Sequence, residues 1–141
     1  MFTEVRMFTI DHLGIAVKSL EQAKQFYRNL GLEIYGEETV AAEKVKLAMV
    51  PVGESRIELL EPTSEESPIA KFLAKRGEGL HHVALHVDNL VETVEKMKQS
   101  GTRFVSEEIK TGAGGHAYIF VHPASAGGVL LELVQDELKG S

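Results

Sequence analysis

The sequence predicts an α+β fold built from two βαβββ modules in one chain. Three observations carry this prediction: a repeat at an offset of 70 residues (His12 to His82), alternating apolar segments at the start of each copy, and helical patterns after them. A chain of 141 residues can bury one core. We therefore expect a single domain over residues 1–141, with repeats at 8–62 and 78–136 and a linker helix at 67–77.

The first strand of each copy has two different faces. In residues 10–17 the large apolar side chains alternate with His12 and small residues, and residues 80–87 repeat the arrangement around His82. The large apolar side chains should pack on helices. The opposite faces, each with a histidine, are suited to a concave site.

A helix is predicted after each first strand. Ser19 and Asn89 begin capping boxes, and Gly31 and Gly101 stand where left-handed C-caps are expected.

Helical spacing also predicts the apolar face of each helix. It assigns Ala23, Phe26 and Leu30 to the first face, and Val94 with Met97 to the second. Each face should cover a sheet.

Further apolar strands follow each helix, and the last strands match as RIELL and LLELV. The linker begins with an N-cap serine and an N1 proline and ends at Gly77, which predicts a short helix. We interpret Glu37-Glu38 and Glu107-Glu108 as solvated turns and Gly112 to Gly115 as a hairpin or gating loop. The expected strands are 44–52, 55–60, 116–121 and 129–134.

Two glutamates lie in apolar strands at matching positions of the repeat. Glu58 and Glu132 each oppose a face of large apolar side chains, and a carboxylate buried there needs a cation or strong donors. The chain has no cysteine, so metal ligands must be histidines and carboxylates. With His12 and His82, the two glutamates form a candidate site for a divalent metal.

The remaining histidines and Glu61 have a simpler interpretation. A lone strand histidine is usually a hydrogen-bonded core or rim residue, and a lone strand glutamate usually faces solvent. We expect hydrogen-bonded core or rim positions for His81, His86, His116 and His122, and a solvent-facing position for Glu61.

The charge argues against some partners. A net charge of -6 and a pI near 5.5 provide no basic surface for nucleic acid or an anionic membrane. Apolar runs are too short for a membrane span, and the first residues lack the pattern of a signal peptide. We expect a soluble, cytoplasmic protein.

Together these segments resemble the vicinal oxygen chelate superfamily, also called the glyoxalase/bleomycin resistance superfamily, whose members pair two βαβββ modules around one divalent metal. Within it they are most similar to the family of methylmalonyl-CoA epimerases. The similarity extends over nearly the whole chain and is most specific in residues 57–62, 67–73 and 112–123.

The resemblance implies a ligand set and a reaction. The family's metal positions fall on His12, Glu58, His82 and Glu132, and cobalt is the expected ion, with nickel, manganese, zinc or iron as alternatives. The implied reaction interconverts (R)- and (S)-methylmalonyl-CoA, an acyl-CoA thioester, through loss and return of the C2 proton and a metal-stabilised enolate. The superfamily also implies a homodimer.

Epimerisation requires an acid or base on each face of C2. Glu132 is the first candidate. Some epimerases carry a second catalytic glutamate where this chain has Leu47. Extended geometry places Glu43 on the same strand face as Leu47, so Glu43 is the second candidate, although a role as a solvated carboxylate is equally open.

Two other functions remain open. A glyoxalase I-type lactoylglutathione lyase could use the same four ligands. A metal-free binding or resistance protein of the same fold would not need them.

Overall fold

The computed structural model describes residues 8–136, which form two compact units. The first unit comprises residues 12–83. The second comprises residues 8–11 together with residues 84–136. Each unit therefore contains most of one predicted repeat.

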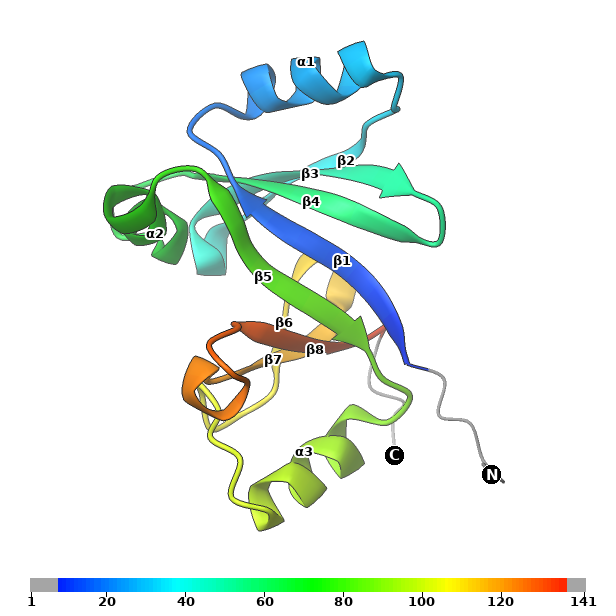
Figure 1. The fold of residues 1–141 in the computed structure, drawn as a ribbon, viewed down its shortest axis with the longest axis vertical. Helices are drawn as coiled ribbons and strands as arrows, with labels where there is room; N and C mark the ends of the chain where they lie inside the picture. Colours follow the sequence, from blue (N-terminus) through cyan, green and yellow to red (C-terminus); the bar gives the residue numbers. More distant parts are fainter. Residues whose placement is uncertain (1–7, 137–141) are drawn as a thin grey trace. The chain divides into compact units, whose positions relative to one another are not determined.

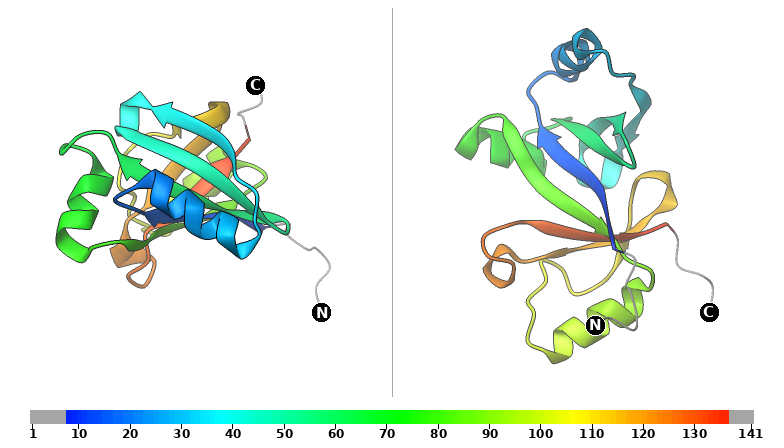
Figure 2. Two further views of the ribbon diagram at one scale, coloured as in Figure 1. Left: turned by 90° about the horizontal axis from the view of Figure 1, so that it is seen from above. Right: turned by 45° about the vertical axis from the view of Figure 1, so that its right-hand side comes forward.

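The first unit has the order β-α-β-β-β, followed by a helix and the beginning of another strand (Figure 1). Its strand order is β2-β3-β4-β1-β5, with β1 parallel to β4 and the two pairs β2–β3 and β3–β4 antiparallel. The two strands of the β3–β4 hairpin also lie side by side in the views of Figure 2. The elements are β1 (Thr9–Ala16), α1 (Leu20–Leu30), β2 (Tyr35–Val40), β3 (Val45–Val52), β4 (Ser55–Pro62), α2 (Pro68–Arg76) and β5 (Gly79–His86).

The core of the first unit lies between α1 and one face of the sheet. Leu20 is 1% exposed and packs with Val50 and Leu59, which are fully buried. The predicted helix face is partly wrong, because Phe26 is 62% and Leu30 is 66% exposed. The stripe that meets the sheet consists instead of Leu20, Ala23, Lys24 and Tyr27, as helical periodicity from Leu20 requires.

The predicted helix ends are confirmed. Ser19 Oγ accepts the Gln22 N–H at 3.1 Å, and Asn89 Oδ1 accepts the Glu92 N–H at 3.0 Å. Gly31 and Gly101 have φ angles of 105° and 88°, in the left-handed region where glycine is favoured.

The linker helix is confirmed as α2. Ser67 caps it by accepting the Ile69 N–H, Pro68 opens it, and Gly77 ends it.

In the second unit the chain leaves β5, forms the helix α3 and then forms the three strands β6, β7 and β8. These strands are antiparallel and have the order β8-β7-β6. Val94 and Met97 of α3 pack against Ile119 and Leu133, as predicted. The Gly112–Gly115 segment forms the predicted hairpin between β6 and β7, with the Gly112 N–H donating to the His116 carbonyl at 2.8 Å. The elements are α3 (Leu90–Gln99), β6 (Lys110–Thr111), β7 (Ala117–Val121) and β8 (Leu131–Gln135).

One predicted turn is a strand. Glu37 and Glu38 lie in β2, and Glu37 accepts a hydrogen bond from Lys24 Nζ at 2.5 Å. Two consecutive carboxylates are typical of a solvated turn, but pairing of β2 with β3 extends the backbone here.

The α+β class and the two βαβββ modules are confirmed within residues 8–136. Residues 1–7 and 137–141 of the expected domain lie outside the described range. Within residues 8–136, no helix has both the length and the apolar character that are needed to cross a membrane.

Candidate metal centre

Three strands of the first unit bring together His12, Glu58 and His82. All three are buried, with exposed fractions of 5%, 7% and 5%. His12 and Glu58 come from the parallel pair β1 and β4, in which Gly14 is the register partner of Glu58. The alternation in each strand directs these polar side chains away from the face covered by α1, as predicted.

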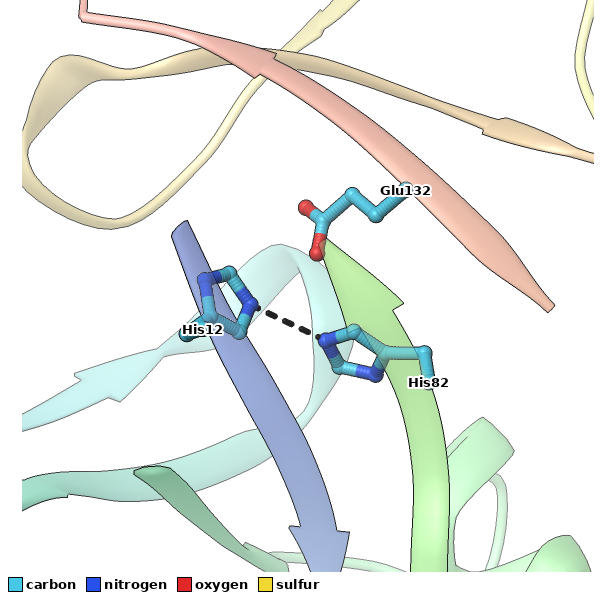
Figure 3. A group of neighbouring side chains, drawn as sticks. All are labelled: His12, His82 and Glu132. Atoms are coloured by element: carbon cyan, nitrogen blue, oxygen red, sulfur yellow. Dashed lines mark hydrogen bonds between the residues drawn. The ribbon is translucent and has the colours of Figure 1, made fainter. Parts of the chain in front are cut away.

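The two imidazole rings face each other through their Nε2 atoms, which lie 3.1 Å apart (Figure 3). Glu58 Oε1 lies 3.4 Å from His12 Nε2 and 3.8 Å from His82 Nε2. Two unprotonated nitrogens at this distance would oppose their lone pairs. The space between them therefore requires a proton or a cation.

These distances fit a bound divalent ion. Two nitrogens that bind one ion at about 2.1 Å would be about 3.0 to 3.4 Å apart, for angles between a right angle and the tetrahedral angle, and the His12–His82 separation of 3.1 Å lies in this range. A pair of imidazoles with a carboxylate is a donor set for cobalt, nickel, manganese, zinc or iron. The residues present thus fit a divalent metal ion.

Gly14 makes room for one of these rings. A Cβ atom at Gly14 would lie 2.2 Å from His82 Cε1 and 2.5 Å from His82 Nδ1. Residue 14 must therefore be glycine if His82 is to keep this position.

His82 has a second imidazole neighbour. His81 Nδ1 lies 2.8 Å from His82 Nδ1, and the His81 ring meets Phe72 of α2 edge to face at 5.0 Å. His81 is thus hydrogen-bonded, as predicted, but its contact with the candidate ligand is not evident from strand alternation.

Glu132 belongs to the second unit, on β8. It is 8% exposed and is the register partner of Phe120 on β7. Its neighbour Leu133 points into the apolar core below α3, so the Glu132 carboxylate is on the opposite face. Like His12 and His82, it is buried and offers one atom that could bind a metal ion.

The predicted strand position of Glu43 is wrong. Glu43 ends a 3-10 turn, Ala41–Glu43, and Lys44 has a left-handed φ of 54° before β3 begins at Val45. The turn interrupts the alternation that would have put Glu43 on the Leu47 face. Its carbonyl accepts the Ser67 hydroxyl at 3.3 Å.

Glu61 is not simply solvated. Its Oε1 accepts the Leu20 N–H at 2.6 Å at the start of α1, and Gln135 Oε1 accepts the Leu90 N–H at 2.7 Å at the start of α3. The matching positions in the repeat could have revealed this role.

Comparison with known proteins identifies the family of the chain. The family model described as Glyoxalase/Bleomycin resistance protein/Dioxygenase superfamily matches residues 11–120. The mitochondrial methylmalonyl-CoA epimerase of Bos taurus is 42% identical over 128 residues, which are 89% of this chain and 73% of the relative.

Solved structures give the same result. The methylmalonyl-CoA epimerase of Mycobacterium tuberculosis has a TM-score of 0.88 and 36% identity over 96% of this chain and 91% of its own. A variant of the Streptomyces coelicolor methylmalonyl-CoA epimerase, in complex with 2-nitronate-propionyl-CoA, has a TM-score of 0.85 and 38% identity over 89% of this chain and 92% of its own. The chain therefore belongs to the glyoxalase/bleomycin resistance superfamily, and within it to the family of methylmalonyl-CoA epimerases.

Proposed function

We propose that this protein is an epimerase that interconverts (R)- and (S)-methylmalonyl-CoA. The observation that carries the proposal is the buried cluster of His12, Glu58 and His82 in a chain of this family. The Streptomyces coelicolor relative binds an acyl-CoA analogue, which supports a coenzyme A thioester as the ligand.

The metal ligands in this proposal are His12, Glu58, His82 and Glu132. Glu132 is included because it is buried and occupies in the second repeat the position that Glu58 occupies in the first. A divalent ion, cobalt in the first instance, supplies Lewis acidity that makes the C2 proton of the substrate easier to remove.

The protein's own groups then move the proton. C2 lies between a thioester and a carboxylate, and Glu132 is the proposed group that takes its proton on one face. Glu43, in the 3-10 turn before β3 rather than on the strand face of Leu47, is the proposed source of a proton on the other face. Return of a proton to the face opposite the one it left inverts C2 and balances the reaction without a redox cofactor.

Apolar side chains line the Glu58 face of the sheet. Leu47 and Leu60 are register partners there and are 3% and 4% exposed. A dry wall of this kind lowers the local dielectric constant, which strengthens electrostatic interactions with a developing enolate.

The test is exchange of the C2 proton in deuterated water. Wild-type protein loaded with cobalt should incorporate deuterium into methylmalonyl-CoA, and protein stripped with a chelator should not until cobalt is returned. His82→Ala should fail under both conditions. The methylglyoxal–glutathione hemithioacetal is the comparison substrate. If the protein turned over that compound and not methylmalonyl-CoA, the proposed activity would be wrong and the protein would be a lactoylglutathione lyase.

A cytoplasmic location and a homodimer are further parts of this proposal. The first is supported by the substrate, because coenzyme A thioesters are intracellular compounds, and the second by the superfamily. Cell fractionation and sedimentation velocity, respectively, would test them.

A further inference from the structure

We infer that His81 is a positioning residue that fixes the tautomer and orientation of His82. The inference rests on the proposed metal site and adds a residue to it. Helix α2 takes part, because Phe72 holds the His81 ring.

The contact between the two histidines is specific. Their Nδ1 atoms lie 2.8 Å apart and their ring planes are 87° apart. Adjacent residues of a strand normally project to opposite faces. The hydrogen bond is therefore not a simple result of their being neighbours in the sequence.

The direction of the hydrogen bond follows from the role of His82. Its Nε2 faces His12 Nε2 at 3.1 Å and must carry a lone pair to bind a metal. In a neutral imidazole the proton is then on Nδ1, so His82 donates and His81 Nδ1 accepts. This arrangement requires the neutral tautomer of His81 with its proton on Nε2.

The His81 ring is itself supported by α2. Phe72 meets it at a centroid distance of 5.0 Å and an interplanar angle of 83°, and the Arg76 guanidinium lies 5.9 Å from the Phe72 ring centroid. An edge-to-face contact restricts rotation of the imidazole. A partner that holds the second nitrogen of a ligating histidine usually increases metal affinity by about 10- to 100-fold.

Two substitutions separate hydrogen bonding from packing. His81→Phe keeps an aromatic ring against Phe72 but removes the acceptor. His81→Asn places an oxygen close to the position of Nδ1 and retains the acceptor. His86→Phe, later in the same strand, is the matched control.

The measurement is the affinity of the apoprotein for cobalt. The visible absorption of the bound cobalt reports the titration. We expect His81→Phe to weaken binding by about 10- to 100-fold, and His81→Asn and His86→Phe to stay within about threefold of wild type. Equal affinity in wild type and His81→Phe would overturn the inference. A loss in His81→Asn as large as that in His81→Phe would also overturn it, because the loss would then not depend on the hydrogen-bond acceptor.

A second readout does not depend on metal binding. Long-range ¹H–¹⁵N correlation spectra of the apoprotein report which nitrogen of His82 carries the proton. We expect Nδ1–H in wild type and in His81→Asn, and Nε2–H on His82 in either protein would overturn the inference. If wild type binds no cobalt, the metal site fails, while these spectra still decide the role of His81.

Discussion

At Gly14 a single missing side chain determines where the His82 ring can lie. An alanine Cβ would approach His82 Cε1 to 2.2 Å, so the ring would have to move. We expect Gly14→Ala to weaken cobalt binding by at least about tenfold. Calorimetric titration of the apoprotein measures the loss.

A double-mutant cycle provides the control for Gly14→Ala. In a His82→Ala background the added methyl group has no ring to displace, so Gly14→Ala should then cause no further loss of affinity. An equal loss in both backgrounds would place the damage elsewhere in β1.

Glu43 is open to a direct kinetic test. Because epimerisation needs a proton donor on the second face of C2, Glu43→Gln should reduce epimerisation by about 100-fold or more while C2 exchange continues. Polarimetry and mass spectrometry follow the two processes. Glu54→Gln, an exposed carboxylate in the turn between β3 and β4, is the control, and unchanged turnover of Glu43→Gln would remove Glu43 from the mechanism.

The sequence predicts the cluster of His12, Glu58 and His82 from two features. The alternation of side chains along each strand assigns these residues to the face opposite the large apolar side chains, and the internal repeat relates the strands that carry them. The sequence does not place Glu43, because the left-handed Lys44 ends the alternation. Nor does it show that the rings of His81 and His82 meet, since strand geometry alone assigns neighbours to opposite faces.

Among the secondary-structure elements, α1 and α3 begin in the same way, with the side-chain oxygen of Glu61 or Gln135 accepting the first backbone N–H. We expect Glu61→Ala to lower the free energy of unfolding by about 1 kcal/mol, because it leaves the Leu20 N–H without this acceptor. Urea denaturation measures the change. Glu61→Gln should lose less, as the amide at Gln135 performs the same role, and an equal loss would indicate that charge rather than capping matters.

Helix α1 also carries Lys24, whose side chain is 8% exposed and bonds to Glu21 at 2.7 Å and to Glu37 at 2.5 Å. The hydrogen bond to Glu21, and then the one to Glu37, raise the pKa of Lys24, and the same Lys24 bond lowers the pKa of Glu21. A raised lysine pKa contributes stability below the ordinary lysine value, and this contribution is lost as the pH rises through the folded value. The lowered carboxyl pKa of Glu21 contributes above its ordinary value and is lost as the pH falls through the folded one.

We therefore expect Lys24→Met to alter the pH dependence more than the stability itself. At neutral pH its free energy of unfolding should be within about 1 kcal/mol of wild type. As the pH rises above about 10, near the ordinary lysine pKa, it should lose less stability than wild type does. Thermal melts across this range measure the difference, with the exposed Lys75→Met as control, and parallel curves would exclude the assignment.

Caps and apolar periodicity predict helices well here, but they do not choose among apolar residues of similar spacing. Helical spacing predicts a buried Phe26, whereas the stripe that faces the sheet contains the charged Lys24. Strand β2, Tyr35–Val40, has a mostly polar sequence and could not be located, because it forms through pairing with β3 rather than through its own alternation.

For the whole molecule, bound metal should act as a stabilising ligand. A ligand present at 100 times its dissociation constant adds about 2.7 kcal/mol to stability. We expect cobalt to raise the melting temperature of the apoprotein by about 5 °C or more. His82→Ala and Glu132→Gln should both lose this increase, and retention of the full increase by Glu132→Gln would exclude that residue as a ligand.

The parallel pairing of β1 with β4 has a consequence for the order of events in folding. The β3–β4 hairpin closes through the short Gly53-Glu54 turn, whereas Leu13 meets its register partner Ile57 only after a loop of more than forty residues has closed. His12 and Glu58 should thus come together late, after the hairpin has formed. A metal ion that binds both residues therefore cannot stabilise the early folding intermediates or the transition state. It should slow unfolding and leave the refolding rate almost unchanged.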